Sequence, residues 1–152
     1  MNERSYPCFP IPGVGAIVVG SKGVLLVRRD KDPGKGLWSI PGGGVEIGET
    51  QEESVVREVN EETGVQCEII DLVSNADLIT PDESGRIEFH YVLNHYLARA
   101  LTETTTHETP EAEVGWFHPD ELPADLVSLQ ITELILSVKD RILEIKAEFD
   151  GV

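Results

Sequence analysis

The chain has 152 residues, of which 40% are hydrophobic, a length that suits one domain over residues 1–152 and leaves little room for a second. Its 12 basic and 28 acidic residues give a formal net charge of −16, which excludes nucleic acid and anionic membranes as partners because both are polyanions. Two cysteines cannot build a disulfide framework, residues 1–13 lack the apolar core of a secretion signal, and no apolar run could span a membrane, so we expect a cytoplasmic protein.

The first third of the chain predicts a hairpin followed by a glycine-rich segment. Residues 14–20 and 23–29 are apolar runs around the sequence GSKG, which favours two strands joined by a tight turn. The segment DKDPGKG at 30–36 predicts a loop because of its proline and glycines. Residues 37–44, LWSIPGGG, predict a strand that runs into a glycine-rich turn.

The pattern then changes to that of a helix over about Gln51–Glu62. Thr50 and Glu53 fit a capping box at its start, and Gly64 is a natural residue to end it. At 100° per residue, the valines at 55, 56 and 59 fall within an arc of about 100°, so we expect one buried apolar stripe.

The rest of the chain predicts strands and one more helix. Residues 67–80 indicate one bent strand or two short ones, 81–86 a turn, and 87–101 a long strand. A polar loop at 102–113 precedes a short strand at 114–117. Apolar residues from Ile131 to Phe149 recur at helical spacing, which predicts a C-terminal helix packed on the sheet.

Three glutamates near the end of the first helix, Glu58, Glu61 and Glu62, set like charges side by side. They project from one edge of the helix, with neighbouring Cβ atoms about 5–6 Å apart. Each like-charged pair costs about 0.2–0.5 kcal/mol, and acids in the last turn oppose the helix dipole. A solvated acidic face would carry these costs, whereas a divalent cation among the carboxylates would reverse them. Oxygen ligands favour Mg²⁺ or Mn²⁺ over zinc.

The glycines just before this helix strengthen the cation interpretation, because glycine lets the backbone approach a cation or a phosphate closely. Five residues separate Gly43 from Glu49, and seven more lead to Arg57. The required positions continue as Glu58, Val59, Glu61, Glu62, Gly64 and Val65. This spacing resembles the Nudix box, Gly-x5-Glu-x7-Arg-Glu-U-x-Glu-Glu-x-Gly-U with U a bulky aliphatic residue, and every fixed position is met. The flanking segments GLWSIPGG and EVGWFHPDELP also resemble members of that family.

The resemblance implies an α/β fold, an α/β/α sandwich in which a mixed β-sheet has the box helix on one side and the C-terminal helix on the other. It implies divalent-metal-dependent hydrolysis of the diphosphate linkage in a nucleoside diphosphate derivative, with Mg²⁺ or Mn²⁺ as the cofactor. The partner is then a small nucleotide, and a homodimer is open because many members of the family are dimers. Metal ions would supply most of the positive charge that this acidic protein lacks.

The resemblance also implies roles for individual residues. Glu58 and Glu62 would be the main metal ligands, Glu61 a further ligand or the general base, and the carbonyl of Gly43 a metal contact. Arg57 would orient carboxylates, and Glu49 would support the metal cluster or this arginine. For the general base a later loop offers Glu108, Glu111 and Glu113, of which we favour Glu111 by alignment on VGWF. Of Arg28 and Arg29, which alternate in facing, one would reach the substrate phosphates, and we assign Arg28 to the substrate site.

The substrate is set mostly outside the box. Pro81 lies 16 positions past Val65, which in the family often accompanies hydrolysis of ADP-ribose to AMP and a phosphorylated product, although Pro81 also opens an ordinary PDESG turn. ADP-ribose or a related nucleotide sugar is therefore the favoured substrate. The alternatives are a nucleoside triphosphate pyrophosphohydrolase that removes oxidised nucleotides and a nucleotide-sensing domain without catalysis.

Overall fold

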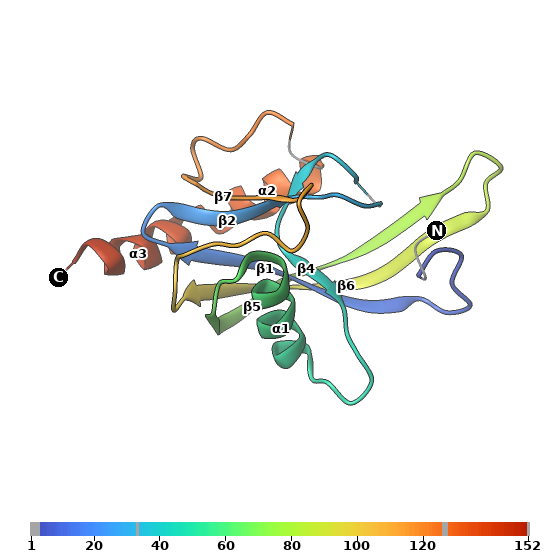
Figure 1. The fold of residues 1–152 in the computed structure, drawn as a ribbon, viewed down its shortest axis with the longest axis horizontal. Helices are drawn as coiled ribbons and strands as arrows, with labels where there is room; N and C mark the ends of the chain where they lie inside the picture. Colours follow the sequence, from blue (N-terminus) through green and yellow to red (C-terminus); the bar gives the residue numbers. More distant parts are fainter. Residues whose placement is uncertain (1–3, 33, 126–127, 152) are drawn as a thin grey trace.

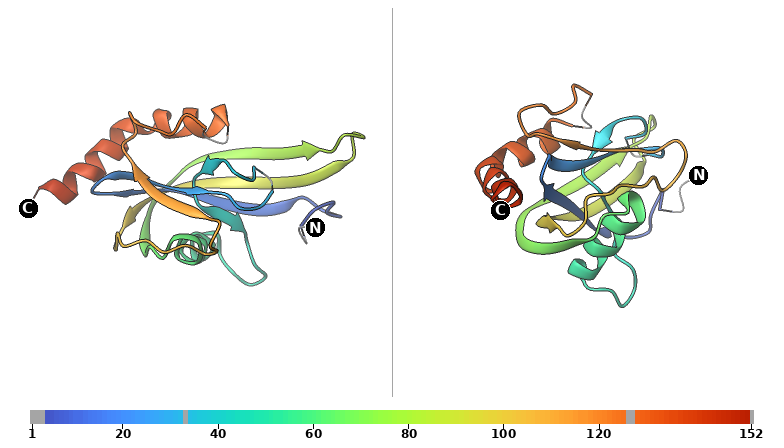
Figure 2. Two further views of the ribbon diagram at one scale, coloured as in Figure 1. Left: turned by 45° about the horizontal axis from the view of Figure 1, so that its top comes forward. Right: turned by 60° about the vertical axis from the view of Figure 1, so that its left-hand side comes forward.

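The computed structural model describes residues 4–32, 34–125 and 128–151. A twisted β-sheet lies between helix α1 on one face and helices α2 and α3 on the other (Figures 1 and 2). Along the chain the elements are β1 (Ile11–Gly20), β2 (Gly23–Arg28), β3 (Trp38–Ser39), β4 (Gly42–Gly44), α1 (Gln51–Thr63), β5 (Cys67–Pro81), β6 (Ile87–Ala100), β7 (Glu113–Phe117), α2 (Leu129–Ser137) and α3 (Lys139–Asp150). This layering confirms the predicted fold class.

Strand β1 is the centre of the sheet, whose main order is β3-β2-β1-β6-β5. It runs parallel to β6 and antiparallel to β2, so the sheet is mixed. Beyond the main order, the N-terminal half of β1 also pairs with β4, and β2 also pairs with β7. Strand β5 closes one side of the sheet, and its pairing with β6 shifts register at three places along its 15 residues.

Alternation along β1 sends side chains to both faces of the sheet, and each face carries its own core. Val14, Ala16 and Val18 pack with the buried valines of α1. Ile17 and Val19 pack on the other face, together with Ile135, Ile142 and Ile145 from α2 and α3. Each helix therefore covers the sheet with one apolar stripe, as helical and strand periodicities together require.

Three local predictions were wrong. The segment Gly42–Gly44 is a strand rather than a turn, because it pairs with β1 at every residue. The C-terminal helix is two helices, which meet at Val138, where the backbone has φ −113°. Val56 lies at the rim of the stripe on α1 and is 39% exposed, so only Val55 and Val59 of the three valines are buried.

The long strands β5 and β6 form a hairpin that extends away from the helices, and the N-terminal segment lies beside its tip (Figure 1). The turn at the tip is held by Asp82, whose side chain accepts hydrogen bonds from Ser84 and from the backbone N–H of Arg86. None of the helices within the described ranges is long and apolar enough to cross a membrane.

Candidate active site

Helix α1 is capped as its sequence predicts. The Thr50 side chain accepts from the Glu53 N–H at 3.1 Å, and the Glu53 side chain accepts from the Thr50 N–H at 3.4 Å. Gly64 ends the helix in the left-handed conformation, with φ 75°. The last turn contains no basic residue, so its acids oppose the helix dipole.

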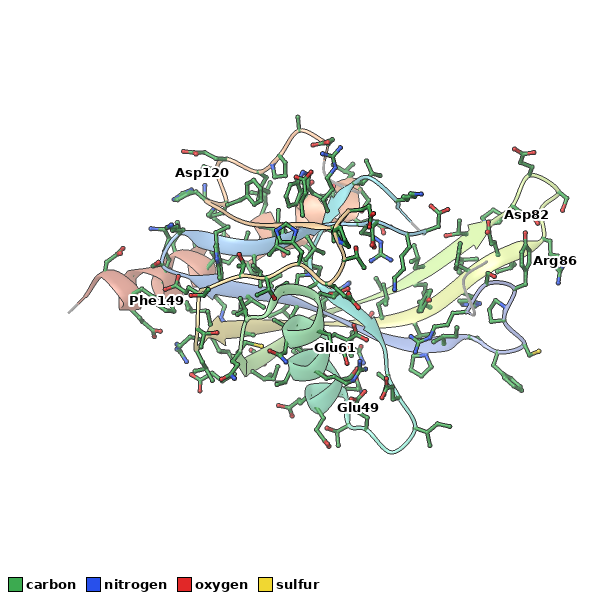
Figure 3. The ribbon with its side chains drawn as sticks, in the orientation of Figure 1. Glu49, Glu61, Asp82, Arg86, Asp120 and Phe149 are labelled. Atoms are coloured by element: carbon green, nitrogen blue, oxygen red, sulfur yellow. The ribbon has the colours of Figure 1, made fainter. Side chains whose placement is uncertain are left out.

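Arg57 organises the acids around the helix (the labelled Glu49 and Glu61 in Figure 3). Its guanidinium binds Glu49 with two hydrogen bonds, at 2.6 and 3.0 Å. It also donates to Glu58 at 3.0 Å, to Glu61 at 3.1 Å and to the Gly44 carbonyl at 3.1 Å. Hydrogen bonds from Arg57 lower the pKa of Glu49 to about 2. Glu49 therefore supports the arginine.

Two of the predicted ligands, Glu58 and Glu62, lie against the glycine strand. A Cβ added at Gly43 would come within 2.6 Å of the Glu58 carboxylate, so only glycine leaves room for it. Glu62 accepts a hydrogen bond from the Gly42 N–H at 2.9 Å. Burial, and then repulsion from Glu58, raise the pKa of Glu62 to about 8, and burial also raises the pKa of Glu58. The site thus holds two carboxylates that disfavour each other's charge in the absence of a cation.

The register of β4 decides which carbonyl faces these acids. Gly43 is opposite Val14 on β1. Two residues away in each direction, the Ala16 N–H donates to the Pro41 carbonyl and the Val45 N–H donates to the Pro12 carbonyl. The antiparallel alternation therefore directs the polar groups of Gly43 toward β1 and those of Gly42 and Gly44 toward the unpaired edge. The bonds from Gly42 to Glu62 and from Arg57 to Gly44 agree with this assignment.

Among the described residues, no three His, Cys, Asp or Glu side chains are arranged together as ligands for a metal ion. On α1 the carboxylate of Glu61 is half-exposed and bound by Arg57, which also donates to Glu58. The carboxylates of Glu58 and Glu62 and the carbonyl of Gly42 are all hard oxygen donors. The two carboxylates repel each other, so a bound cation would stabilise them. This donor set fits Mg²⁺ or Mn²⁺.

The loop after β6 brings one more acid to the site. It is held to the end of α1 by a bond from the Thr106 N–H to the Thr63 carbonyl. Glu108 in this loop raises the pKa of both Glu58 and Glu62 through its charge. The sequence offered Glu108 as a candidate for the general base beside Glu111, the residue that alignment on the following strand favours.

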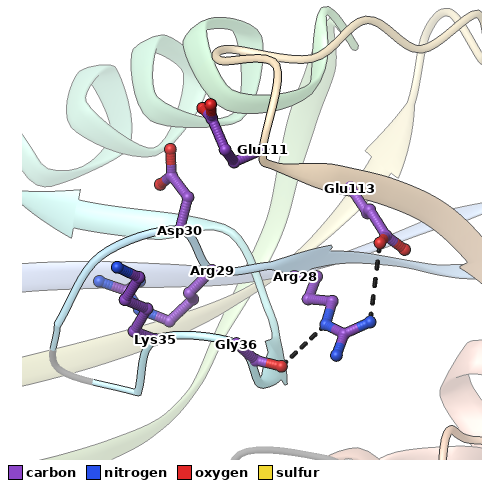
Figure 4. A pocket seen from close by; sticks show the side chains of 7 residues that line it. All are labelled: Arg28, Arg29, Asp30, Lys35, Gly36, Glu111 and Glu113. Atoms are coloured by element: carbon purple, nitrogen blue, oxygen red, sulfur yellow. Dashed lines mark hydrogen bonds and ion pairs between the residues drawn. The ribbon is translucent and has the colours of Figure 1, made fainter.

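A pocket of about 520 Å³ opens beside these residues, between the loop after β2 and the start of β7 (Figure 4). It is lined by Arg28, Arg29, Asp30, Lys35, Gly36, Glu111 and Glu113. Arg28 donates to the Gly36 carbonyl at 2.8 Å and lies 3.6 Å from Glu113. Arg29 lowers the pKa of Glu62 by its charge, so this arginine acts on the acidic site. Lys35, which we did not single out in the sequence, adds a third cation.

The sequence of this chain matches a known protein family over most of its length. The model of the NUDIX domain matches residues 10–135. The chain belongs to the Nudix family. A solved structure, a MutT NUDIX hydrolase from Burkholderia pseudomallei, is 32% identical and has a TM-score of 0.73, covering 86% of this chain and 98% of that one.

Two curated Nudix relatives resemble the chain over different lengths. A putative mutator protein MutT4 of Mycobacterium tuberculosis is 35% identical over 152 residues, which cover 99% of this chain and 59% of the relative. An ADP-ribose pyrophosphatase of Methanocaldococcus jannaschii is 48% identical over 56 residues, which cover 37% of this chain and 33% of the relative. The alignments thus span less than two thirds of either relative.

Proposed function

We propose that this Nudix protein hydrolyses the diphosphate linkage of a nucleoside diphosphate derivative. Water attacks one phosphorus, the bridging P–O bond breaks, and the proton of the water passes to a protein carboxylate. With ADP-ribose the products are AMP and ribose phosphate. A bound Mg²⁺ or Mn²⁺ supplies charge neutralisation for the phosphate oxygens, which is most of what phosphoryl transfer requires.

The observation that carries this proposal is the contact of Glu58 and Glu62 with Gly43 and Gly42. Two carboxylates with raised pKa values, packed against the partly buried glycine backbone of β4, form a cluster of like charges that a bound cation would stabilise. We assign the metal to Glu58, Glu62 and the Gly42 carbonyl. The sequence predicts the Gly43 carbonyl as a metal contact, but the register of β4 directs it toward β1. Gly43 serves the site in another way, because its lack of a Cβ makes room for Glu58.

The general base is an acid at the rim of this cluster. Glu108 is favoured because its charge acts on both ligand carboxylates. Glu61, held by Arg57, and Glu111, in the adjoining pocket, stay as the alternatives. Arg28 and Arg29 both line the pocket, and Arg29 is favoured for the substrate phosphates because its charge acts on Glu62.

Two observations favour ADP-ribose or a related nucleotide sugar. Pro81 stands at the position expected for such members, and the relative that is an ADP-ribose pyrophosphatase is 48% identical over the 56 residues aligned. The likeness to a mutator protein over 99% of the chain supports the second candidate, a pyrophosphohydrolase acting on nucleoside triphosphates. We also propose that the protein acts in the cytoplasm; a homodimer is compatible with the site.

The first test replaces the ligand carboxylate by its amide. Glu62→Gln should lower kcat by at least about a hundredfold, because it removes a ligand while keeping the shape of the side chain. The matched control is Glu52→Gln, which removes the same charge from an exposed position in the first turn of the same helix. Unchanged turnover in Glu62→Gln, with Mg²⁺ or Mn²⁺ present, would refute the metal assignment.

A second test separates the substrate classes. The protein is incubated with ADP-ribose, ADP-glucose, NADH and oxidised and ordinary nucleoside triphosphates, and the release of AMP and of pyrophosphate is measured separately. AMP from ADP-ribose at the highest kcat/KM supports the favoured substrate. Pyrophosphate from triphosphates supports the second candidate, and binding without hydrolysis of any compound identifies a nucleotide sensor.

A further inference from the structure

The loop between β6 and β7 folds back on itself around Glu108. The sequence Thr-Pro-Glu-Ala favours a tight turn because Pro110 stands at its second position, and the Ala112 N–H donates to the Thr109 carbonyl at 3.2 Å. The His107 ring donates through Nδ1 to the Ala112 carbonyl. The residues on both sides of Glu108 are therefore held by hydrogen bonds.

Thr109 also connects this loop to a second one through its side chain. The Thr109 hydroxyl donates to the Asp30 carboxylate, and both residues are half-buried. Asp30 follows Arg29 in the loop after β2, which is closed by a bond from the Gly36 N–H to the Arg29 carbonyl at 2.7 Å. In Figure 4 the Asp30 side chain points from this loop toward Glu111. The hydrogen bond between Thr109 and Asp30 therefore joins the β6–β7 loop to the loop after β2.

The position of Glu108 depends on these neighbours. Glu108 is exposed, and its side chain makes no hydrogen bond or ion pair with any residue in the described ranges. Its place is therefore set by the backbone on either side, where Thr109 supplies the link to the rest of the site. A hydrogen bond to a carboxylate is stronger than one between neutral groups, and half-burial limits competition from water, so this link is suited to hold a loop.

We propose that Thr109 is a positioning residue, which through its bond to Asp30 holds Glu108 in place and joins it to the loop that carries Arg29. The inference rests on the proposed function, because it takes Glu108 as the general base and Arg29 as the arginine for the substrate phosphates. A general base acts within hydrogen-bond reach of the attacking water, and a displacement of about 1 Å can lower the rate by about a hundredfold.

The first test removes the hydroxyl of Thr109. Thr109→Val should lower kcat by about tenfold or more and change KM by less than about threefold, because the base is displaced while the phosphate-binding groups stay. Thr109→Ser, which keeps the hydroxyl, should recover most of the loss. Thr104→Val is the matched control, since Thr104 is an exposed residue of the same loop. A parental kcat in Thr109→Val would overturn the inference.

A double-mutant cycle tests the partner. Asp30→Ala should lower kcat about as much as Thr109→Val, and the double variant should be no worse than either, because both changes remove one bond. Asp30 also lines the pocket with Arg28 and Lys35, and a role in neutralising these cations would instead change KM. Effects on kcat that add in the double variant would show that Asp30 acts independently of Thr109, and the inference would fail.

Amide hydrogen exchange measures the link between the loops without substrate. The Gly36 N–H reports on the loop after β2, and the Ala112 N–H reports on the β6–β7 loop. In Thr109→Val both amides should exchange at least about threefold faster than in the parent protein, because either loop opens more often when the bond is absent. In Thr104→Val neither rate should change. Faster exchange at Ala112 alone, or at neither amide, would mean that the loops move independently and would contradict the inference.

The outcome can be separated from that of the proposed function. If the parent protein hydrolyses substrate and Thr109→Val has the same kcat, only this inference fails. If no compound in the panel is hydrolysed, the proposed function fails, and the exchange rates at Gly36 and Ala112 decide whether Thr109 joins the two loops.

Discussion

At the scale of single residues, one arginine offsets part of the charge of an acidic segment. From Glu46 to Glu62 the chain has seven glutamates and only Arg57 as a cation, a local charge of −6. Arg57 contacts glutamates before the helix and on it, and only 21% of its side chain is exposed. The acids raise the pKa of Arg57, so it stays charged at every accessible pH.

We therefore predict that Arg57→Lys damages both stability and activity. An ammonium cannot reproduce the paired hydrogen bonds to Glu49 and also reach Glu58 and Gly44. The free energy of unfolding should fall by about 1–3 kcal/mol and kcat by about tenfold or more. Urea unfolding and steady-state kinetics measure the two effects, and a lysine variant with parental values for both would show that fork geometry is unimportant here.

His95 gives a prediction about pH. Its side chain is 5% exposed, and within the described ranges its Nδ1 has no hydrogen-bond partner. Burial lowers its pKa below the ordinary 6.5, so as pH falls below about 6.5 the unfolded chain binds a proton that the folded chain does not. Stability is lost on that side, by at most about 1.4 kcal/mol per pH unit.

His95→Phe removes this titration and the unpaired nitrogen together. The difference in unfolding free energy, variant minus parent, should be near zero or positive at pH 7.5 and should grow toward pH 5.5. Other titrating groups, Glu62 included, are common to both proteins and cancel in the difference. A difference that stays constant between these pH values would mean that His95 has the same pKa in the folded and the unfolded chain.

At the scale of elements, the end of α1 ties the helix to the loop that carries Glu108. Gly64 has φ 75°, and a Cβ there would come within 2.5 Å of the Thr106 hydroxyl. Gly48 has a similar φ of 85° but open space around it. The two glycines therefore separate backbone strain from a collision with the loop.

We predict that Gly48→Ala costs about 1–2 kcal/mol from left-handed backbone strain alone. Gly64→Ala should cost more, and it should also lower kcat because the loop must move. Chemical unfolding of both variants, with kinetics of each, checks this. Equal losses in the two variants, with normal turnover in Gly64→Ala, would mean that the loop does not depend on the helix end.

Local signals explain which elements could be predicted. The caps of α1, Thr50 and Gly64, act within four residues of the groups they bind, so sequence alone locates them. The glycine strand was missed as a strand because its pairing with β1 is a tertiary contact that overrides weak strand propensity. The break at Val138 was missed because the apolar spacing continues through it.

The site divides in the same way. Glu58, Glu62 and Arg57 share one helix, so their proximity follows from helical geometry. The place of Glu108 beside the site depends on where a loop comes to lie, which no spacing within the box specifies. The choice between the carbonyls of Gly42 and Gly43 depends on sheet register, which a shift of one residue would reverse.

At the scale of the whole molecule, two cores share one sheet, and we predict that they unfold together. Trp116 packs against the core under α1, while Trp38 packs against the core under α2 and α3 and meets Phe117 edge to face at 5.1 Å. Trp38→Phe and Trp116→Phe each leave one tryptophan to report on one core. In each variant, the urea transition followed by tryptophan fluorescence should coincide with the one followed by circular dichroism, as expected for a single domain. Separate midpoints for fluorescence and circular dichroism within either variant would instead indicate two folding units.

The irregular ladder of β5 has a consequence for concentrated solutions. A strand of 15 residues at the border of a sheet, if flat, would present a row of backbone groups on which a neighbouring molecule could build. Its three register shifts twist that border, and the exposed acids Glu68, Asp71 and Asp77 lie along it. We therefore expect edge-to-edge addition of a neighbouring molecule to be disfavoured along β5, the longest of the described strands.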